Sequence, residues 1–153
     1  MSSFLKKKPI LTQSKQVLKF EKIWSKWLGV RYSVFVNSGA SANLLSIQLL
    51  KLKYPKGGEV IVPAHTWSSD VSSIMHCGFK PVFADIDLNT LGMNTDQIIS
   101  KINRNTKAVF LSYIQGFNCL TKKLNDFLKK KKIMLIEDVC ESHGAKFLNR
   151  KLG

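Results

Sequence analysis

Apolar residues along the chain alternate between short β-branched runs and longer stretches with helical spacing. This alternation is typical of a parallel sheet whose strands are joined by crossover helices. The short runs predict strands at residues 32–36, 59–62, 81–85, 108–113 and 133–136. The longer stretches predict helices at residues 16–27, 40–52, 68–77, 95–102 and 120–130. We therefore expect an α/β fold, with a mostly parallel sheet and helices on both faces.

Two of these helices differ in where their apolar side chains fall. The helix at residues 40–52 is apolar around most of its circumference, so we expect it to be buried at the centre of the fold. The helix at residues 120–130 has one apolar stripe opposite a lysine-rich face, which is typical of a helix that covers one side of a sheet. Residues 147–153 predict a turn into further structure, because nothing there closes a fold.

The chain is strongly basic, with 24 Lys and Arg residues against 10 Asp and Glu residues and a formal net charge of +14. Such an excess attracts polyanions, so a basic polyanion-binding domain is one alternative. The lysines, however, fall at the N-terminus and around predicted helices, as on ordinary solvated surfaces. No RNA-binding or zinc-finger signature accompanies them. We expect no nucleic-acid partner.

Targeting and cysteine signals are weak. No apolar run approaches the roughly 20 residues needed to cross a bilayer, and the N-terminus lacks a cleavable signal. We therefore expect a cytoplasmic protein without a membrane partner. Cys77, Cys119 and Cys140 are an odd number without a C-x-x-C pair, so we expect reduced thiols and no metal site.

A run of small residues, Asn37–Asn43, joins the first predicted strand to the following helix. Free backbone amides at a helix start, together with the helix dipole, form a phosphate site when small side chains let the anion approach. The alternative is an ordinary capped helix, with Ser38 as the cap and Gly39 as a turn residue.

Two other strand ends carry candidate chemistry. Trp67 follows the second predicted strand, where its ring could cover a flat heteroaromatic ring or simply pack in the core. Glu137 and Asp138 end the fifth predicted strand, where open α/β sheets place ligands. A buried carboxylate there needs a cation, and a protonated pyridine nitrogen would supply one. A carboxylate that binds a metal or forms an ion pair is the alternative.

The ordered set of motifs resembles the DegT/DnrJ/StrS family of pyridoxal-phosphate-dependent sugar aminotransferases, from about Phe20 to Gly153. The resemblance implies the pyridoxal-phosphate-dependent transferase fold of the aspartate aminotransferase type I. Residues 1–30 would be an N-terminal segment with a helix that leads into the first strand, and residues 31–153 an incomplete large domain. The matching motifs are the turn after Ser38-Gly39, the strand end at Thr66-Trp67, the strand Pro81–Asp87, and Glu137-Asp138 followed by His143-Gly144-Ala145.

The resemblance also implies which residues bind the cofactor, pyridoxal 5'-phosphate or pyridoxamine 5'-phosphate. Gly39, Ala40 and Ser41 would hold its phosphate. Trp67 would stack on the pyridine ring, Asp138 would pair with the ring nitrogen, and Glu141 would lie near the phenolic oxygen. Family aminotransferases usually carry glutamine at the position of Glu141.

For the activity, the resemblance implies a nucleotide-sugar substrate, glutamate as amino donor, a homodimer at full length and a role in surface polysaccharide synthesis. The Schiff-base lysine of the family lies downstream, so no catalytic residue is expected within this chain, and a non-catalytic fragment is an alternative. Transamination at the sugar ketone is the commoner family reaction. Glu141 and Gln115 instead favour the keto-deoxysugar 3-dehydratases, in which histidine replaces that lysine, so both chemistries stay open.

Overall fold

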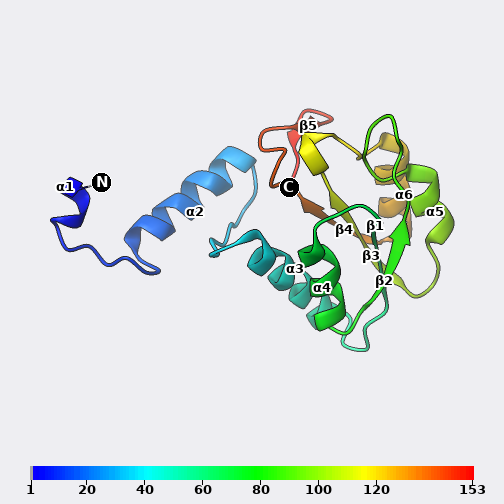
Figure 1. Ribbon diagram of the computed structural model, residues 1–153, viewed down its shortest axis with the longest axis horizontal. Helices are drawn as coiled ribbons and strands as arrows, with labels where there is room; N and C mark the ends of the chain where they lie inside the picture. The colour runs from blue at the N-terminus through cyan, green and yellow to red at the C-terminus, as the bar shows by residue number, and fades with distance from the viewer. Residues whose placement is uncertain (1) are drawn as a thin grey trace. The chain divides into compact units, whose positions relative to one another are not determined.

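The computed structural model describes residues 2–153, which divide into two compact units. The first unit ends at Phe35 and contains α1 (Ser2–Leu5) and α2 (Lys15–Leu28). The second unit, Val36–Gly153, contains the sheet and the remaining helices (Figure 1). The candidate site lies in this second unit.

The helix α2 confirms the prediction for residues 16–27. It ends at Gly29, whose φ of 86° is left-handed and whose N–H donates to the Ser25 carbonyl. Glycine suits this position because it adopts positive φ without steric cost. The ring of Phe20 lies 5.7 Å from that of Phe35, so the chain after α2 folds back along the helix.

The predicted strand at residues 32–36 is wrong for this structure. Tyr32 and Val34 are 79% and 76% exposed, and the segment is extended without ladder hydrogen bonds. Side chains of the first unit bind its backbone instead: the N–H of Phe35 donates to Glu21 Oε1 at 2.8 Å, and its carbonyl accepts from Gln13 Nε2 at 3.3 Å. A strand needs a paired neighbour, and within residues 2–153 none lies beside this segment.

The other four predicted strands form one parallel sheet, in the order β2-β1-β3-β4. Their boundaries lie within two residues of those predicted. Because all strands run the same way, the carboxyl ends of β1, β3 and β4 meet at one edge of the sheet. The strands are β1 (Glu59–Pro63), β2 (Lys80–Ala84), β3 (Thr106–Ser112) and β4 (Met134–Asp138).

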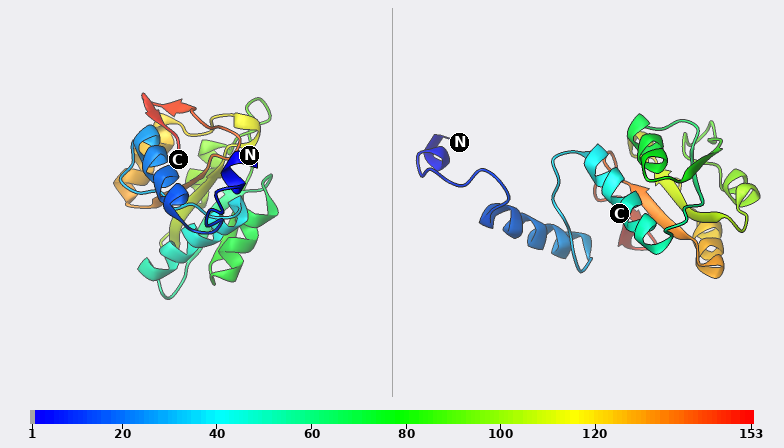
Figure 2. Two further views of the ribbon diagram at one scale, coloured as in Figure 1. Left: turned by 90° about the vertical axis from the view of Figure 1, so that its left-hand side faces the viewer. Right: turned by 90° about the horizontal axis from the view of Figure 1, so that it is seen from below.

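Helices cover both faces of the sheet, as predicted (Figures 1 and 2). Side chains alternate between the faces along each strand. In β1, Val60 and Val62 pack on the side of α3 and α4, whereas Ile61 packs on the side of α5 and α6. The helices are α3 (Gly39–Lys53), α4 (Ser68–His76), α5 (Thr95–Lys101) and α6 (Lys122–Lys131).

The prediction that α3 is buried on all sides is wrong. One face packs, through Asn43, Ile47 and Leu50. On the other face Leu49 and Leu52 are 68% and 78% exposed. The sheet and α4 cover only one side of the helix, which leaves its other apolar side open. The prediction for α6 is confirmed, since its apolar stripe is buried while its lysines face outward.

The predicted turn near the end of the chain is present, but it belongs to a small antiparallel hairpin that was not predicted. The hairpin pairs β5 (Lys146–Phe147) with β6 (Arg150–Lys151). Leu148 and Asn149 form its turn with φ values of 47° and 64°. Leu152 then packs into the core at 5% exposure, so this segment is anchored.

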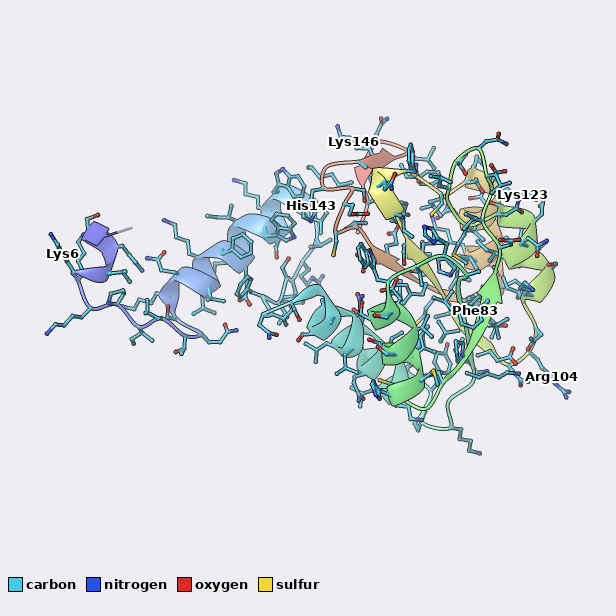
Figure 3. All side chains as sticks on the ribbon, viewed as in Figure 1. Lys6, Phe83, Arg104, Lys123, His143 and Lys146 are labelled. Atoms are coloured by element: carbon cyan, nitrogen blue, oxygen red, sulfur yellow. The ribbon has the colours of Figure 1, made fainter. Side chains whose placement is uncertain are left out.

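Charge is distributed unevenly along the strand direction. The C-termini of the helices and the starts of the strands share one edge of the sheet. Among the described residues at these element ends, Glu59 is acidic and many others are basic. Arg104 at this edge and Lys123 at the start of α6 lie at opposite ends of the unit (Figure 3). We call this the basic edge. Its cations are Lys51, Lys53, Lys56, Lys80, Lys101, Arg104, Lys107, Lys129, Lys130, Lys131 and Lys132.

Among the described residues, no helix is long and apolar enough to cross a bilayer.

Candidate functional site

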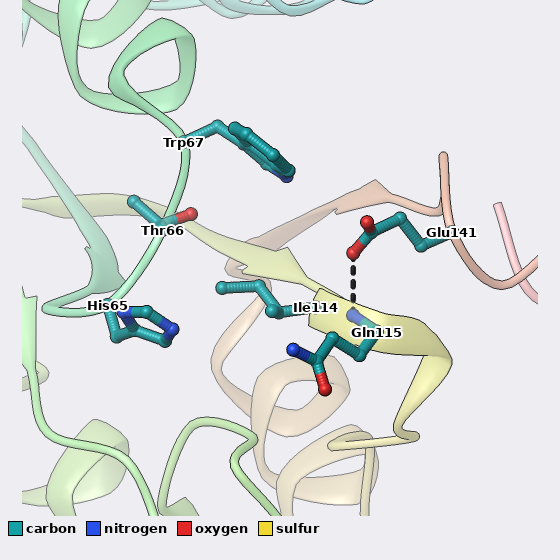
Figure 4. Close-up of a pocket in the computed structure, with 6 residues that line it drawn as sticks. All are labelled: His65, Thr66, Trp67, Ile114, Gln115 and Glu141. Carbon is teal, nitrogen blue, oxygen red and sulfur yellow. Dashed lines mark hydrogen bonds between the residues drawn. The ribbon is translucent and has the colours of Figure 1, made fainter.

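A hollow of about 260 Å³ opens beyond the carboxyl ends of β1 and β3 (Figure 4). Beside it, at the end of β4, Trp67, Asp138 and Glu141 lie close together around a gap too small for a water molecule. The structure therefore brings together three of the predicted site residues from two separate segments, the residue before α4 and the end of β4 with its following loop. The hollow is lined by His65, Thr66, Trp67, Ile114, Gln115 and Glu141.

Trp67 lies between β1 and α4, as the residue that precedes the first turn of α4. Its side chain is 55% exposed, and its ring faces the hollow across from Glu141 (Figure 4). The ring is therefore not a core aromatic. It is placed so that a flat ligand could stack on it.

Asp138 is the last residue of β4 and is only 9% exposed. Its Oδ2 accepts from Asn43 Nδ2 at 3.0 Å, and its Oδ1 accepts from the Cys140 backbone N–H at 3.1 Å. None of the salt bridges Lys80–Glu59, Lys122–Asp126 and Lys123–Asp96 includes Asp138. Nor is there, within residues 2–153, a cluster of three His, Cys, Asp or Glu side chains that could hold a metal. A buried carboxylate, held by an amide and a backbone N–H, thus ends β4 beside Trp67.

A second carboxylate, Asp70 of α4, lies behind Asp138 and is fully buried. Its Oδ1 accepts from Asn43 Nδ2 at 2.8 Å. Its Oδ2 accepts from Ser112 Oγ at 2.5 Å and also from the hydroxyl of Thr66. Burial raises the pKa of Asp70 above its ordinary value, the hydrogen bonds from Ser112 and Thr66 act in the opposite direction, and the charge of Asp138 raises it further.

Sequence reasoning missed this group of Asn43, Thr66, Asp70 and Ser112. One signal was present. Asn43 shares the buried face of α3 with Ile47, four residues on, so a polar side chain interrupts an otherwise apolar stripe. Buried polar groups require partners, and that requirement would have pointed to a polar site beneath the helix.

The start of α3 lies next to the loop that follows Asp138. Ser38 caps the helix, accepting from the Ser41 N–H at 3.2 Å, and the Ser41 hydroxyl donates to Asn37 Oδ1 at 2.7 Å. The N–H groups of Gly39 and Ala40 are exposed and have no acceptor among the described residues. A Cβ on Gly39 would lie 3.4 Å from Cys140 Sγ, so the helix start adjoins the loop after Asp138.

The capped-helix interpretation is thus correct for Ser38, and it leaves two backbone amides at the helix start that can bind an anion.

Glu141 holds the turn on the opposite wall. Its Oε2 accepts from the Gln115 N–H at 2.6 Å. Gln115 and Gly116 both have positive φ, of 54° and 80°, in the short 3₁₀ helix Ile114–Gly116. A side chain at Gly116 would meet the Glu141 carbonyl at 2.9 Å. The Glu141 side chain and the Gln115 backbone are therefore in direct contact.

Cys140 lies between these walls as a free thiol. Burial, followed by its hydrogen bond with Asp138 and the nearby carboxylate charges, raises the pKa of Cys140 to about 11. The thiol is therefore neutral at physiological pH and adds no further negative charge beside Asp138.

Comparison with known proteins adds the decisive observation. The profile of the DegT/DnrJ/EryC1/StrS aminotransferase family matches residues 2–153. The chain belongs to this family. The predicted family is confirmed, and the geometry described above is that of a DegT/DnrJ/EryC1/StrS protein.

Two curated relatives differ in their reactions. The GDP-4-keto-6-deoxy-D-mannose 3-dehydratase of Yersinia pseudotuberculosis is 36% identical over 152 residues, which cover 94% of this chain and 38% of the relative. The GDP-perosamine synthase of Vibrio cholerae is 33% identical over 144 residues, covering 94% of this chain and 39% of the relative. This chain thus spans less than half the length of either relative.

The fold is confirmed by a solved structure. A crystal structure of GDP-4-keto-6-deoxymannose-3-dehydratase with a trapped PLP-glutamate geminal diamine superposes with a TM-score of 0.91 at 35% identity. The match covers 99% of this chain and 40% of that one. The second unit therefore has the architecture of a pyridoxal-phosphate-dependent enzyme.

Proposed function

We propose that this protein is the N-terminal part of a pyridoxal-phosphate-dependent enzyme that acts on a nucleotide-linked keto-deoxysugar. The observation that carries the proposal is Asp138, a buried carboxylate at the end of β4 that lies beside Trp67 and takes part in none of the three salt bridges described for this chain. A protonated pyridine ring fits this donor set, because it brings a cation to the carboxylate and a flat face to the indole. When bound, such a ring supplies an electron sink for bond breaking beside the sugar ketone.

Each predicted cofactor residue has a role that its surroundings support. The N–H groups of Gly39 and Ala40 bind the cofactor phosphate, and the Ser41 hydroxyl, which donates to Asn37 in this structure, turns to the phosphate as a further donor. Trp67 covers the ring, Asp138 keeps the ring nitrogen protonated, and Glu141 lies near the phenolic oxygen. We assign residues 31–153 to the large, cofactor-binding domain.

Between the two family reactions we favour 3-dehydration of a GDP-linked 4-keto-6-deoxysugar. The curated relatives at 36% and 34% identity are 3-dehydratases, and the contact between Glu141 and Gln115 involves the two positions that resemble that subgroup. Transamination at the sugar ketone is the second candidate, which the GDP-perosamine synthase at 33% identity supports. Both reactions are proposed for the full-length gene product, with glutamate as amino donor.

The two reactions differ in where the glutamate nitrogen goes. The full-length protein is incubated with pyridoxal 5'-phosphate, GDP-4-keto-6-deoxymannose and isotopically labelled glutamate. Dehydration breaks the C3–O bond and the oxygen leaves as water. The two reducing equivalents from glutamate stay in the sugar, so the product has one oxygen atom fewer than the substrate, and the labelled nitrogen leaves as ammonia. Transamination keeps the label in an amino sugar. Mass spectrometry distinguishes these products, and an unchanged sugar would contradict the proposed function.

We further propose that the full-length protein is a cytoplasmic homodimer whose product enters surface polysaccharide, such as lipopolysaccharide. The exposed leucines of α3 support the dimer. Leu45, Leu49 and Leu52 are 47%, 68% and 78% exposed and recur at helical spacing on one face. A contiguous apolar stripe of this kind is expected where another protein surface packs.

A further inference from the structure

Two buried carboxylates in the site share one amide group. Asn43 Nδ2 lies 2.8 Å from Asp70 Oδ1 and 3.0 Å from Asp138 Oδ2, so its two hydrogens are divided between them. The three residues come from α3, α4 and β4, and the amide is buried with them. An amide nitrogen can only donate and an ionised carboxylate can only accept, so the charge on Asp70 fixes the direction in which the Asn43 amide points.

Asp70 is held entirely by neutral donors. Thr66 and Ser112 reach one of its oxygens and Asn43 the other, while none of the ion pairs within residues 2–153 includes it. A fully buried carboxylate without a cation costs stability even when it is hydrogen-bonded. An asparagine of the same size could fill the space and bond to the same neighbours. The charge at this position is therefore not explained by packing.

The contacts of Asp138 show what the charge can do. Its two oxygens are held from opposite sides, by Asn43 and by the Cys140 N–H, which restrains rotation of the carboxylate. Each carboxylate oxygen has a further lone pair, so Asp138 can still accept from a ring N–H. The bond from Asn43 depends on the orientation that Asp70 imposes.

We propose that Asp70 is a positioning residue that acts through Asn43, fixing the Asp138 carboxylate toward the cofactor ring nitrogen and adding a second negative charge behind it. The second charge favours the protonated ring, because it strengthens the negative potential at the nitrogen in a site shielded from water. This inference rests on the proposed function for its ligand, but the link between the two carboxylates can be tested without any cofactor.

The first test follows the carboxyl carbon of Asp70 by NMR during a pH titration of the cofactor-free chain. In Asp138→Asn the pKa of Asp70 should fall, because the nearby charge that raises it is removed. The matched control is Asp96→Asn, which removes an exposed charge at the same end of the strands without touching the pair. An Asp70 pKa that ignores Asp138→Asn would overturn the coupling, whatever the cofactor does.

The second test uses the full-length protein with pyridoxamine 5'-phosphate labelled at the ring nitrogen. In Asp70→Asn the pKa of that nitrogen should fall by about one unit, a tenfold loss of proton affinity, from removal of one charge at close range. In Asp96→Asn it should not change. Asn43→Ala should give a smaller loss than Asp70→Asn, because it removes the bridge but keeps the charge of Asp70.

A ring-nitrogen titration that is the same in Asp70→Asn and the unaltered protein would overturn the positioning role. Failure of the unaltered protein to bind pyridoxamine 5'-phosphate would instead overturn the proposed function, and the carboxyl titration would still decide whether the two acids are coupled.

Discussion

At the scale of single residues, Asp70 departs most from what its position in the chain indicates. An acid in the first turn of a helix ordinarily faces solvent, where it interacts with the helix dipole. Here the side chain turns inward to Thr66 and Ser112 and is fully buried. Its partners lie on other elements, so local sequence could not reveal its burial. The same residue links stability to pH.

Substitution Asp70→Asn should alter that link. The raised pKa means that the folded chain keeps the Asp70 proton at pH values where the unfolded chain has lost it. The contribution of Asp70 to the free energy of unfolding is therefore lost as the pH rises from about 4 through the pKa that Asp70 has in the folded state. Asparagine lacks this effect, so the variant should gain stability relative to the unaltered chain with rising pH, by about 1.4 kcal/mol for each unit of pKa shift. Urea unfolding at several pH values measures this difference, and a difference independent of pH would contradict it.

At the scale of elements, the regular pattern of the sequence predicted most of the sheet and its helices. Strands such as β3 alternate between two apolar faces, and α6 has a single apolar stripe, so local periodicity was sufficient. Periodicity failed where the environment is set from far away. Residues 32–36 have strand composition but no partner among the described residues, and α3 is apolar on a side that nothing described covers.

The residues of the candidate site also fall into those that local sequence could predict and those that it could not. Trp67 and Asp138 could be predicted because each follows an apolar strand in a parallel sheet, and such strand ends meet at one edge. The hydrogen bonds around Asp70 could not be predicted from the sequence. They depend on the register between β3 and β4 and on how α3 packs over these strands. The short hairpin at Lys146–Lys151 is too brief to leave a periodic signal.

Helix caps give a prediction at this scale. Thr121 caps α6, with its hydroxyl oxygen accepting from the Leu124 N–H at 3.1 Å, whereas Ser14 precedes α2 without any side-chain cap bond. Thr121→Ala should therefore lower the free energy of unfolding by about 1 kcal/mol, the usual worth of a cap. Ser14→Ala should have a much smaller effect. Urea unfolding compares the two, and equal losses would argue against a stabilising cap at Thr121.

At the scale of the whole molecule, the apolar stripe of α3 bears on assembly. A monomer that exposed Leu45, Leu49 and Leu52 together would pay a solvation cost that a partner surface removes. Because these leucines lie on the helix whose start we propose to bind the cofactor phosphate, assembly and cofactor binding would share one element.

Leu49→Lys should therefore weaken the full-length dimer, because it places a charge in the centre of the stripe. We expect at least about a tenfold rise in the dimer dissociation constant, equivalent to about 1.4 kcal/mol. Leu88→Lys is the matched control, since Leu88 is 84% exposed in the loop after β2. Analytical ultracentrifugation measures both, and a Leu49→Lys protein that dimerises normally would exclude this face from the interface.

The basic edge has a practical consequence for ligand measurements. It gathers cations at the strand starts, away from the site at the strand ends, so phosphate-bearing ligands meet an attractive surface that is not their binding site. At low ionic strength such loose association would mask the true affinity. Near 0.1 M salt the Debye length falls to about 10 Å, and exposed lysines are then largely screened while the enclosed site is not. The salt dependence of ligand affinity should therefore distinguish nonspecific binding at the basic edge from specific binding in the site.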